Sequence, residues 1–237
     1  MAFNYYSNNG RGGGFLASLP PVTKNLIIIN VIVFLATLVN EDFMIGTFAL
    51  FYPTSQFFHW WQVVTHMFMH GGFWHIFFNM YTLLIFGSVV ERYIGPKKFL
   101  LFYFVCGLGA VALHFGVEYW QMQSYMEGAA LGNATALQRI EAIKFTPTVG
   151  ASGAIYGVLM GYAMIFPESK MTLLFPPVTL SAKWMVVVFA VIELFTGVTG
   201  LSAGIAHFAH LGGMLVGFLL MFWWRRSRRL YDRDLWF

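Results

Sequence analysis

Charged residues are scarce in this chain of 237 residues: Asp, Glu, Lys and Arg make up 10% of it, against about 25% in soluble domains. Hydrophobic residues reach 58%, above the roughly 45–50% typical of soluble domains. Ten acidic and fourteen basic side chains are too few to cover the surface of a water-soluble globule of this size. The aromatic content of 19% also excludes an intrinsically disordered chain. We predict an integral membrane protein.

Cysteine is represented by Cys106 alone, inside an apolar run, which excludes a disulfide scaffold. The net charge of +4 is unevenly distributed, because five basic residues follow the last apolar run. That placement is typical of a cytoplasmic stop after a membrane span and of contact with anionic lipid headgroups. We therefore expect membrane lipids as partners and no nucleic acid, with binding of nucleic acid by this tail as the weaker alternative. The five residues are Arg225, Arg226, Arg228, Arg229 and Arg233.

Uncharged runs predict an all-α membrane protein with six spanning helices. The spans are placed at about 25–40, 72–90, 99–117 and 145–167, with two more between Trp184 and Trp224 that are divided by 196–204. Pro53 and several Trp and His precede the second span, which predicts a partly re-entrant outer loop. A polar loop is expected at 118–144, with a helical part at 128–143. The organisation is then a short leader (1–23), a six-helix core (24–224) and a basic tail (225–237).

The distribution of Lys and Arg predicts the orientation, because cytoplasmic loops carry more of both. With the N-terminus in the cytoplasm, twelve of the fourteen basic residues face inside, and only Arg139 and Lys144 face outside. We therefore predict that both termini are cytoplasmic. The N-terminal stretch lacks the form of a cleavable signal or transit peptide, so we expect the first span to stay in place. This favours a multi-pass protein of a bacterial inner membrane.

Three of the predicted spans carry polar side chains at a matching depth, about 10 Å or less below the outer surface. His75 and Asn79 lie four residues apart on one helical face, and Ser152 lies near the start of the fourth span. His207 and His210 lie near the start of the sixth. Because polar groups inside a membrane are costly, these residues are candidates for a functional site.

A serine, a histidine and further donors at one depth are what acyl transfer requires. A serine hydroxyl becomes a good nucleophile when a histidine accepts its proton, and the resulting oxyanion needs hydrogen-bond donors aimed at it. None of the ten acidic residues is expected at this depth, so we predict a Ser–His dyad of Ser152 and His210 without a carboxylate. Tyr156 shares a helical face with Ser152 and is expected to hold the imidazole. His207 is the competing base.

Four short motifs follow one another along these spans. In chain order they are the series His66, His70, His75 and Asn79, the trio Glu91, Arg92 and Gly95, Gly150-Ala151-Ser152-Gly153 with Tyr156, and Ala209-His210-Leu211-Gly212-Gly213 with Gly217. With these motifs the chain resembles the rhomboid family of intramembrane serine proteases over roughly residues 24–224. The resemblance implies the six-helix rhomboid bundle and, as substrates, transmembrane or juxtamembrane segments of other membrane proteins.

The same resemblance implies a role for each site residue. Ser152 would be the nucleophile and His210 the general base, with Gly150, Gly153 and Tyr156 supporting the pair. His75, Asn79 and the backbone N–H groups of Ala151 and Ser152 would form the oxyanion hole. No cofactor and no metal are implied. The Trp-Arg pair that the family has in its first outer loop is Trp61-Gln62 here, a change that concerns loop anchoring and lipid contacts rather than catalysis.

Three alternatives remain beside a protease. A rhomboid-like binder or chaperone of membrane proteins would lack the dyad, whereas both members are present here. A transporter is suggested by Glu193, which is alone in the fifth span, although we rather expect this residue to face the bundle or the inner half and to bond to a neighbour. A zinc site could use His66, His70 and His75, although the HExxH pattern and a nearby carboxylate are missing. The oligomeric state and the identity of the substrate stay open.

Overall fold

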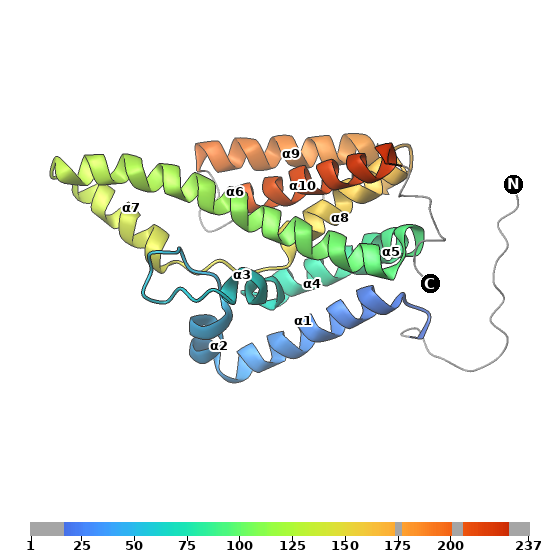
Figure 1. Cartoon of the computed structure of the whole chain (residues 1–237), viewed down its shortest axis with the longest axis horizontal. Helices are drawn as coiled ribbons and strands as arrows, with labels where there is room; N and C mark the ends of the chain where they lie inside the picture. The colour runs from blue at the N-terminus through green and yellow to red at the C-terminus, as the bar shows by residue number, and fades with distance from the viewer. Residues whose placement is uncertain (1–16, 174–176, 201–205, 228–237) are drawn as a thin grey trace, which may run out of the picture.

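A computed structural model describes residues 17–173, 177–200 and 206–227 of the chain (Figure 1). Residues 1–16, 201–205 and 228–237, which include parts of the predicted leader, span divide and tail, lie outside the described residues. The described elements are α1 (Pro21–Val39), α2 (Glu41–Phe48), α3 (Gln62–Thr65), η2 (His66–Phe68), α4 (Phe73–Thr82), the π-helical segment η3 (Leu83–Gly87), α5 (Ser88–Ile94), α6 (Pro96–Ala130), α7 (Ala134–Phe145), α8 (Ser152–Ile165), β1 (Lys170–Thr172), β2 (Thr179–Ser181), α9 (Ala182–Thr199) and α10 (His207–Arg226).

The long helices lie side by side in one bundle, with α8 and α10 between α9 on one side and α1 on the other (Figure 1). Helix α10 packs against α6, α8 and α9, and α6 also packs against α8. The start of α1 and the end of α10 lie at the same end of the bundle, near α5 (Figure 1). The hairpin of α6 and α7 extends from the opposite end.

Among the described residues, five helical stretches are long and apolar enough to cross a membrane: α1, the continuous run Phe73–Ile94, α6, α9 and α10. This confirms the prediction of a helical membrane protein. Helix α8 is apolar but has only 14 residues, about 21 Å of helix against a hydrocarbon core of about 30 Å. The predicted fourth span began at residue 145, whereas α8 begins at Ser152, because Thr148 pairs with Leu50 in an isolated β-bridge. The count of six spans stays a prediction.

The stretch 118–144 was expected to be a polar loop with a helical part at 128–143. It forms a helical hairpin, in which α7 matches most of the expected helical part and the rest of the expected loop is wrong. Helix α6 continues without a break to Ala130, and α7 follows after a three-residue turn. The residues after 118 are rich in Gln, Glu, Met and Ala, which are good helix formers, and they include no proline. Asn133 then caps α7, since its side chain accepts hydrogen bonds from the N–H groups of Thr135 and Ala136. Polar composition was mistaken for a lack of helix.

A short hairpin of two three-residue strands joins α8 to α9 within the otherwise helical fold. Strand β1 pairs with β2 in antiparallel register, with Met171 opposite Leu180. Met171 is buried and packs with Met185 and Val186 of α9. The hairpin therefore attaches the start of α9 to the bundle through a small apolar cluster.

The loop between α2 and α3 is tied together by Gln62, which stands where the resemblance implies an arginine. The Gln62 side chain is fully buried; its oxygen accepts from the His59 N–H at 3.0 Å, and its nitrogen donates to the Phe57 carbonyl at 2.9 Å. Trp61 donates from Nε1 to the Thr47 carbonyl at 2.9 Å. A neutral amide thus anchors this loop.

Glu91 connects α5 to the start of α1. Its carboxylate accepts hydrogen bonds from the N–H groups of Val22 at 2.9 Å and Thr23 at 2.7 Å, and the side chain is almost fully buried. These N–H groups belong to the first turn of α1, where no partner exists within the helix. Glu91 therefore caps α1 from a second helix and holds the two together.

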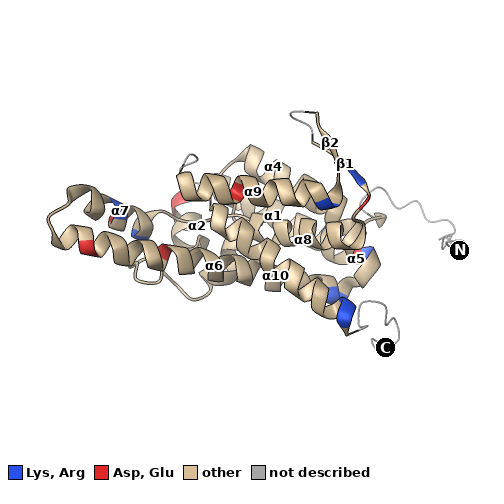
Figure 2. Cartoon of the chain, turned by 90° about the horizontal axis from the view of Figure 1, so that it is seen from above, with Lys and Arg blue, Asp and Glu red and all other residues tan. Residues whose placement is uncertain are grey.

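Lys and Arg gather at the end of the bundle where α10 ends and α5 lies, with a smaller group on α7 at the opposite end (Figure 2). This is the asymmetry on which the predicted orientation depends. The orientation itself, with the α6–α7 hairpin outside and both termini in the cytoplasm, stays a prediction.

Candidate active site

Ser152 is the first residue of α8 and is placed there by a glycine turn. Gly150 has a φ of +132°, a conformation that other residues rarely adopt, and its N–H donates to the His66 carbonyl at 3.0 Å. A Cβ atom at this position would lie 2.9 Å from the His75 ring. Glycine at 150 is therefore needed both for the backbone turn and for the approach of His75 to the serine.

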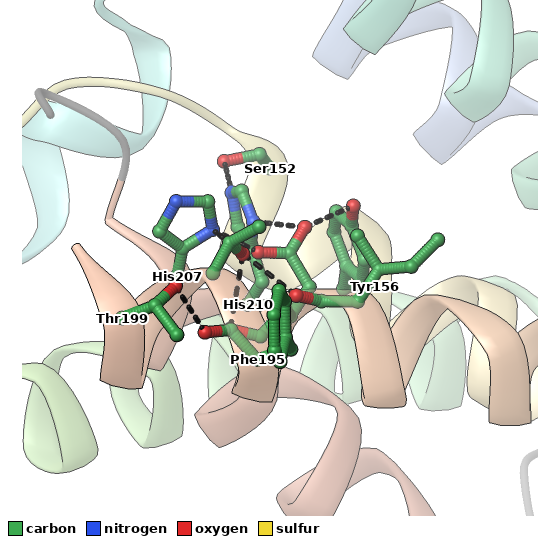
Figure 3. A network of polar contacts seen from close by, with 9 residues as sticks. Ser152, Tyr156, Phe195, Thr199, His207 and His210 are labelled. Carbon is green, nitrogen blue, oxygen red and sulfur yellow. Dashed lines mark hydrogen bonds and ion pairs between the residues drawn. The ribbon is translucent and has the colours of Figure 1, made fainter. Parts of the chain in front are cut away.

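His210 lies in the first turn of α10, and its Nε2 atom is 2.7 Å from the Oγ atom of Ser152. The Tyr156 ring stacks on the imidazole, with ring centroids 4.3 Å apart and planes inclined by 6°. Figure 3 shows Ser152 and Tyr156 of α8 facing His207 and His210 of α10. The structure thus brings the serine, the expected base and the expected supporting tyrosine together.

Small residues allow α8 and α10 to approach closely enough for this contact. A Cβ atom on Gly213 would overlap the Gly153 carbonyl oxygen, and one on Gly217 would lie 2.9 Å from the Gly157 carbonyl oxygen. Both clashes involve backbone atoms, which cannot rotate away. These glycines therefore set the helix spacing that places His210 beside Ser152.

A carboxylate is present at the site, contrary to the prediction of a dyad without one. The Oε1 atom of Glu193 in α9 lies 2.9 Å from Nδ1 of His210, and Oε2 lies 2.5 Å from Nδ1 of His207. The Tyr156 hydroxyl donates to Oε1 at 2.5 Å. Glu193 lies six residues before the end of α9, about 9 Å along the helix, and so at the depth of Ser152. The boundary between the fifth and sixth spans was uncertain in sequence, so this depth was misjudged.

His207, the competing base, points its Nδ1 atom toward Glu193 and Thr196 rather than toward the serine. Its Nδ1 atom is 3.1 Å from the Thr196 hydroxyl oxygen, and that hydroxyl also donates to the Ile192 carbonyl at 2.7 Å. Neither Thr196 nor Glu193 was among the residues predicted for the site. The signal for Glu193 was its isolation in an apolar span, which predicted a bond to a neighbour in the bundle but not that the neighbours would be Tyr156, His207 and His210.

Two of the expected oxyanion-hole donors are backbone N–H groups at the start of α8. The N–H groups of Ala151 and Ser152 precede the first intrahelical hydrogen bond of α8, which leaves them without a partner in the helix. The His75 ring lies against Gly150, beside Ser152. Asn79 is buried and donates to the His75 carbonyl at 3.0 Å, within its own helix. The structure therefore places His75 next to the serine, while the Asn79 amide bonds locally.

His66 and His70 lie between α3 and α4 and are both buried. The Nδ1 atom of His66 is 2.8 Å from the Gln62 carbonyl, and burial lowers the pKa of His66 to about 4. Burial, and secondarily the nearby His75, lowers the pKa of His70 to about 3. Both side chains are uncharged at neutral pH. The His66 ring thus contacts the loop backbone, whereas both ring nitrogens of His70 are buried without a hydrogen-bond partner among the described residues.

The residues that could bind a metal ion differ from those that the sequence suggested. Within the described part of the chain, the ligand atoms that gather closely are those of Glu193, His207 and His210, all within 4.8 Å of one another, rather than those of His66, His70 and His75. These atoms already face one another at hydrogen-bonding distance. The carboxylate is hydrogen-bonded to Tyr156 and His207 and lies within ion-pair distance of His210, so the closeness of these atoms is explained by contacts within the protein.

A small cavity lies next to the serine, with room for about one water molecule at about 20 Å³. Its lining includes Ser152, His66, His114 and Thr148. The Nε2 atom of His114 is 3.1 Å from the Thr148 hydroxyl oxygen. The site therefore has a mainly apolar chamber, with a few polar side chains, of the size of one water molecule.

Comparison with known proteins is consistent with this geometry. The sequence model of the Rhomboid domain matches residues 58–227. The chain is 28% identical over 211 residues to the Rhomboid protease GlpG of Yersinia pestis (strain Pestoides F), covering 87% of this chain and 64% of that protein. It is 26% identical over 208 residues to the Rhomboid protease AarA of Providencia stuartii, covering 84% of this chain and 70% of that protein. The chain thus spans about 64% of the length of its GlpG relatives.

Proposed function

Because the chain belongs to the rhomboid family, we propose that it is a serine endopeptidase that cleaves transmembrane or juxtamembrane segments of other membrane proteins near the outer face of the bilayer. The observation that carries the proposal is the distance of 2.7 Å between His210 Nε2 and Ser152 Oγ. The relatives are bacterial and are named rhomboid proteases, and the chain is an integral multi-pass membrane protein. We place it in the inner membrane of a bacterium.

The reaction begins when Ser152 attacks the carbonyl carbon of the scissile peptide bond. His210 Nε2 accepts the hydroxyl proton as the Oγ–C bond forms, and the carbonyl oxygen becomes an oxyanion. The N–H groups of Ala151 and Ser152, at the positive end of α8, would stabilise that charge, with the His75 ring beside them. Asn79 joins them if its amide leaves the His75 carbonyl. The imidazolium then gives its proton to the leaving amine, and an acyl-enzyme remains.

Water completes the cycle. The cavity beside Ser152 has room for one water molecule. A water molecule that takes the place of the leaving amine next to His210 Nε2 gives its proton to the imidazole as its oxygen attacks the acyl carbon. The second tetrahedral intermediate collapses, the Oγ–C bond breaks, and the proton returns to Ser152. The carboxylic acid product leaves and the enzyme is regenerated.

A non-catalytic binder of membrane proteins is the competing function. A binder needs no proton acceptor at a half-buried serine, whereas here the serine hydroxyl faces an imidazole at hydrogen-bonding distance. The transporter hypothesis was based on an isolated Glu193, but this residue contacts Tyr156, His207 and His210 of the site. The hydrogen-bonded serine therefore favours the enzyme.

Labelling by a fluorescent fluorophosphonate tests the proposal, because this probe reacts with an activated serine whatever the natural substrate. We expect the detergent-purified wild type to be labelled, and Ser152→Ala and His210→Ala to show no labelling above background. Thermal melting of all three proteins checks that the variants are folded. A folded wild type that is not labelled, or a Ser152→Ala variant that is, would contradict the proposed chemistry.

A further inference from the structure

Glu193 stands at the centre of a buried network that joins three helices. Its carboxylate in α9 contacts the Tyr156 hydroxyl of α8 and the Nδ1 atoms of His207 and His210 of α10, at 2.5, 2.5 and 2.9 Å. The Glu193 residue is only 7% exposed. A buried carboxylate is costly unless it is paired, so its position beside the expected catalytic histidine calls for a reason beyond packing.

We propose that Glu193 is a positioning residue for His210, so that the side chains of Ser152, His210 and Glu193 act together as one unit. This inference rests on the proposed function. The two ring nitrogens of His210 face opposite partners, Nε2 toward the serine at 2.7 Å and Nδ1 toward Glu193 at 2.9 Å. This order of hydroxyl, imidazole and carboxylate is the one that general-base activation of a serine uses.

The carboxylate acts on the imidazole in two ways. It favours the tautomer with the proton on Nδ1, which leaves the lone pair of Nε2 free to accept the Ser152 proton. It also stabilises the imidazolium that forms as that proton arrives, while Glu193 itself stays unprotonated. The carboxylate oxygen lies off the direction of the His210 N–H bond, and the buried Nδ1 has no hydrogen-bond partner in the described residues. The interaction is therefore mainly that of a charge close to the ring.

Neighbouring side chains hold the carboxylate in place. Tyr156 stacks on the His210 ring and donates its hydroxyl to Glu193, so one side chain orients both the base and its partner. His207 lies against the other carboxylate oxygen, and the Thr196 hydroxyl oxygen lies 3.1 Å from Nδ1 of that imidazole. Both His210 and Glu193 are thus held by a further contact, as a preorganised site requires.

Removing the negative charge shifts the pH dependence of the serine reaction. The groups that face His210 are Ser152 and Tyr156 from α8, Glu193 from α9 and His207 from its own helix, with His75 of α4 and His114 of α6 within electrostatic range. Glu193 is the acidic residue among these. Without it the imidazolium is less stable, so the acid limb of the rate profile moves to lower pH while the maximal rate falls.

The test measures the rate constant of fluorophosphonate labelling between pH 5 and 9 for the wild type, Glu193→Gln and Glu193→Asp. In this step the Oγ–P bond forms, fluoride leaves and the serine proton passes to His210. We expect Glu193→Gln, which keeps the size and loses the charge, to react at least about 100-fold more slowly, with the acid limb at lower pH. Glu193→Asp keeps the charge at a longer distance and should react at an intermediate rate, with the acid limb of the wild type.

Glu91→Gln is the matched control, because Glu91 is an equally buried carboxylate that caps α1. It should lower the melting temperature and leave the pH profile of the folded protein unchanged. A Glu193→Gln variant that reacts within about threefold of the wild type, with the same acid limb, overturns the inference and leaves the proposed function intact. If Glu193→Gln does not fold, Glu193→Asp decides, and a wild-type rate overturns the inference. An unlabelled wild type defeats the proposed function, and this inference with it.

Discussion

Uncharged histidines beneath the active site make the fold sensitive to acid. His66 and His70 are 5% and 2% exposed, and burial is the main reason that their pKa values fall to about 4 and about 3. In the unfolded chain both would bind a proton near pH 6.5. The unfolded state therefore holds more protons than the folded state below that pH, and the free energy of unfolding decreases as the pH falls.

We expect the wild type to lose stability between about pH 6.5 and pH 4, by up to about 1.4 kcal/mol per pH unit for each of the two histidines. The His70→Gln variant removes one of these groups, so its melting temperature should fall less steeply with acidification. His59→Gln, which removes an exposed imidazole, is the control. Melting temperatures measured in detergent from pH 7.5 to 4.5 check this. Equal slopes in the wild type and His70→Gln would show that His70 is not held uncharged.

At the scale of elements, the spacing of α8 and α10 determines whether the catalytic contact exists. The two helices meet at glycines, and backbone atoms of one helix occupy the space that a side chain on the other would fill. Close backbone approach through small residues is a common way for membrane helices to pack, since lipid provides no hydrophobic drive between them. In this fold the same packing presses His210 of α10 against Ser152 of α8.

Gly213→Ala should therefore lower the free energy of unfolding by roughly 1–3 kcal/mol and reduce labelling of the protein that remains folded. The added methyl group meets the Gly153 carbonyl, and the helices must separate to admit it. Gly116→Ala is the control, because nothing lies within 4 Å of a Cβ atom at that site on α6. Melting temperature and fluorophosphonate labelling report the two effects. If Gly213→Ala behaves like Gly116→Ala in both, the helices do not depend on this contact.

At the scale of the whole molecule, the bundle has two chemically different ends. One end carries most of the Lys and Arg, and the other carries the α6–α7 hairpin (Figure 2). The positive-inside rule places the hairpin outside and the end of α10 in the cytoplasm. The active site then lies nearer the outer face, because Ser152 and His210 begin their helices from that side.

Accessibility of introduced cysteines to a membrane-impermeant maleimide tests this orientation. Leu131→Cys, in the turn of the hairpin, is 90% exposed and should be labelled in intact cells that express the protein. Ser227→Cys, exposed after α10, should be labelled only after the membrane is permeabilised. The native Cys106 is buried and serves as the background control. The reverse pattern would invert the orientation and move the site to the cytoplasmic half.

Several features of the site were predictable from sequence because they depend on local spacing. Ser152 and Tyr156 share one helical face at any depth, and the glycine turn before Ser152 depends on its own backbone. Predicting the contact between Ser152 and His210 also required the topology, because the alternating direction of the predicted spans placed both residues at one depth. Asn79 shows the limit of such reasoning, because the direction in which its amide bonds depends on the local packing of α4.

The sequence by itself determined that this is a helical membrane protein and which serine and histidine to compare, since apolar content, charge asymmetry and motif spacing are properties of the chain. Only the tertiary structure decided that the 118–144 stretch is a helical hairpin and that Glu193 of α9 reaches His210 of α10. The reason is physical: a helical hairpin at 118–144 depends on the packing of α7 against α6, and contact between α9 and α10 depends on where α9 ends and how it is rotated. Neither packing nor rotation is encoded in the pattern of either segment alone.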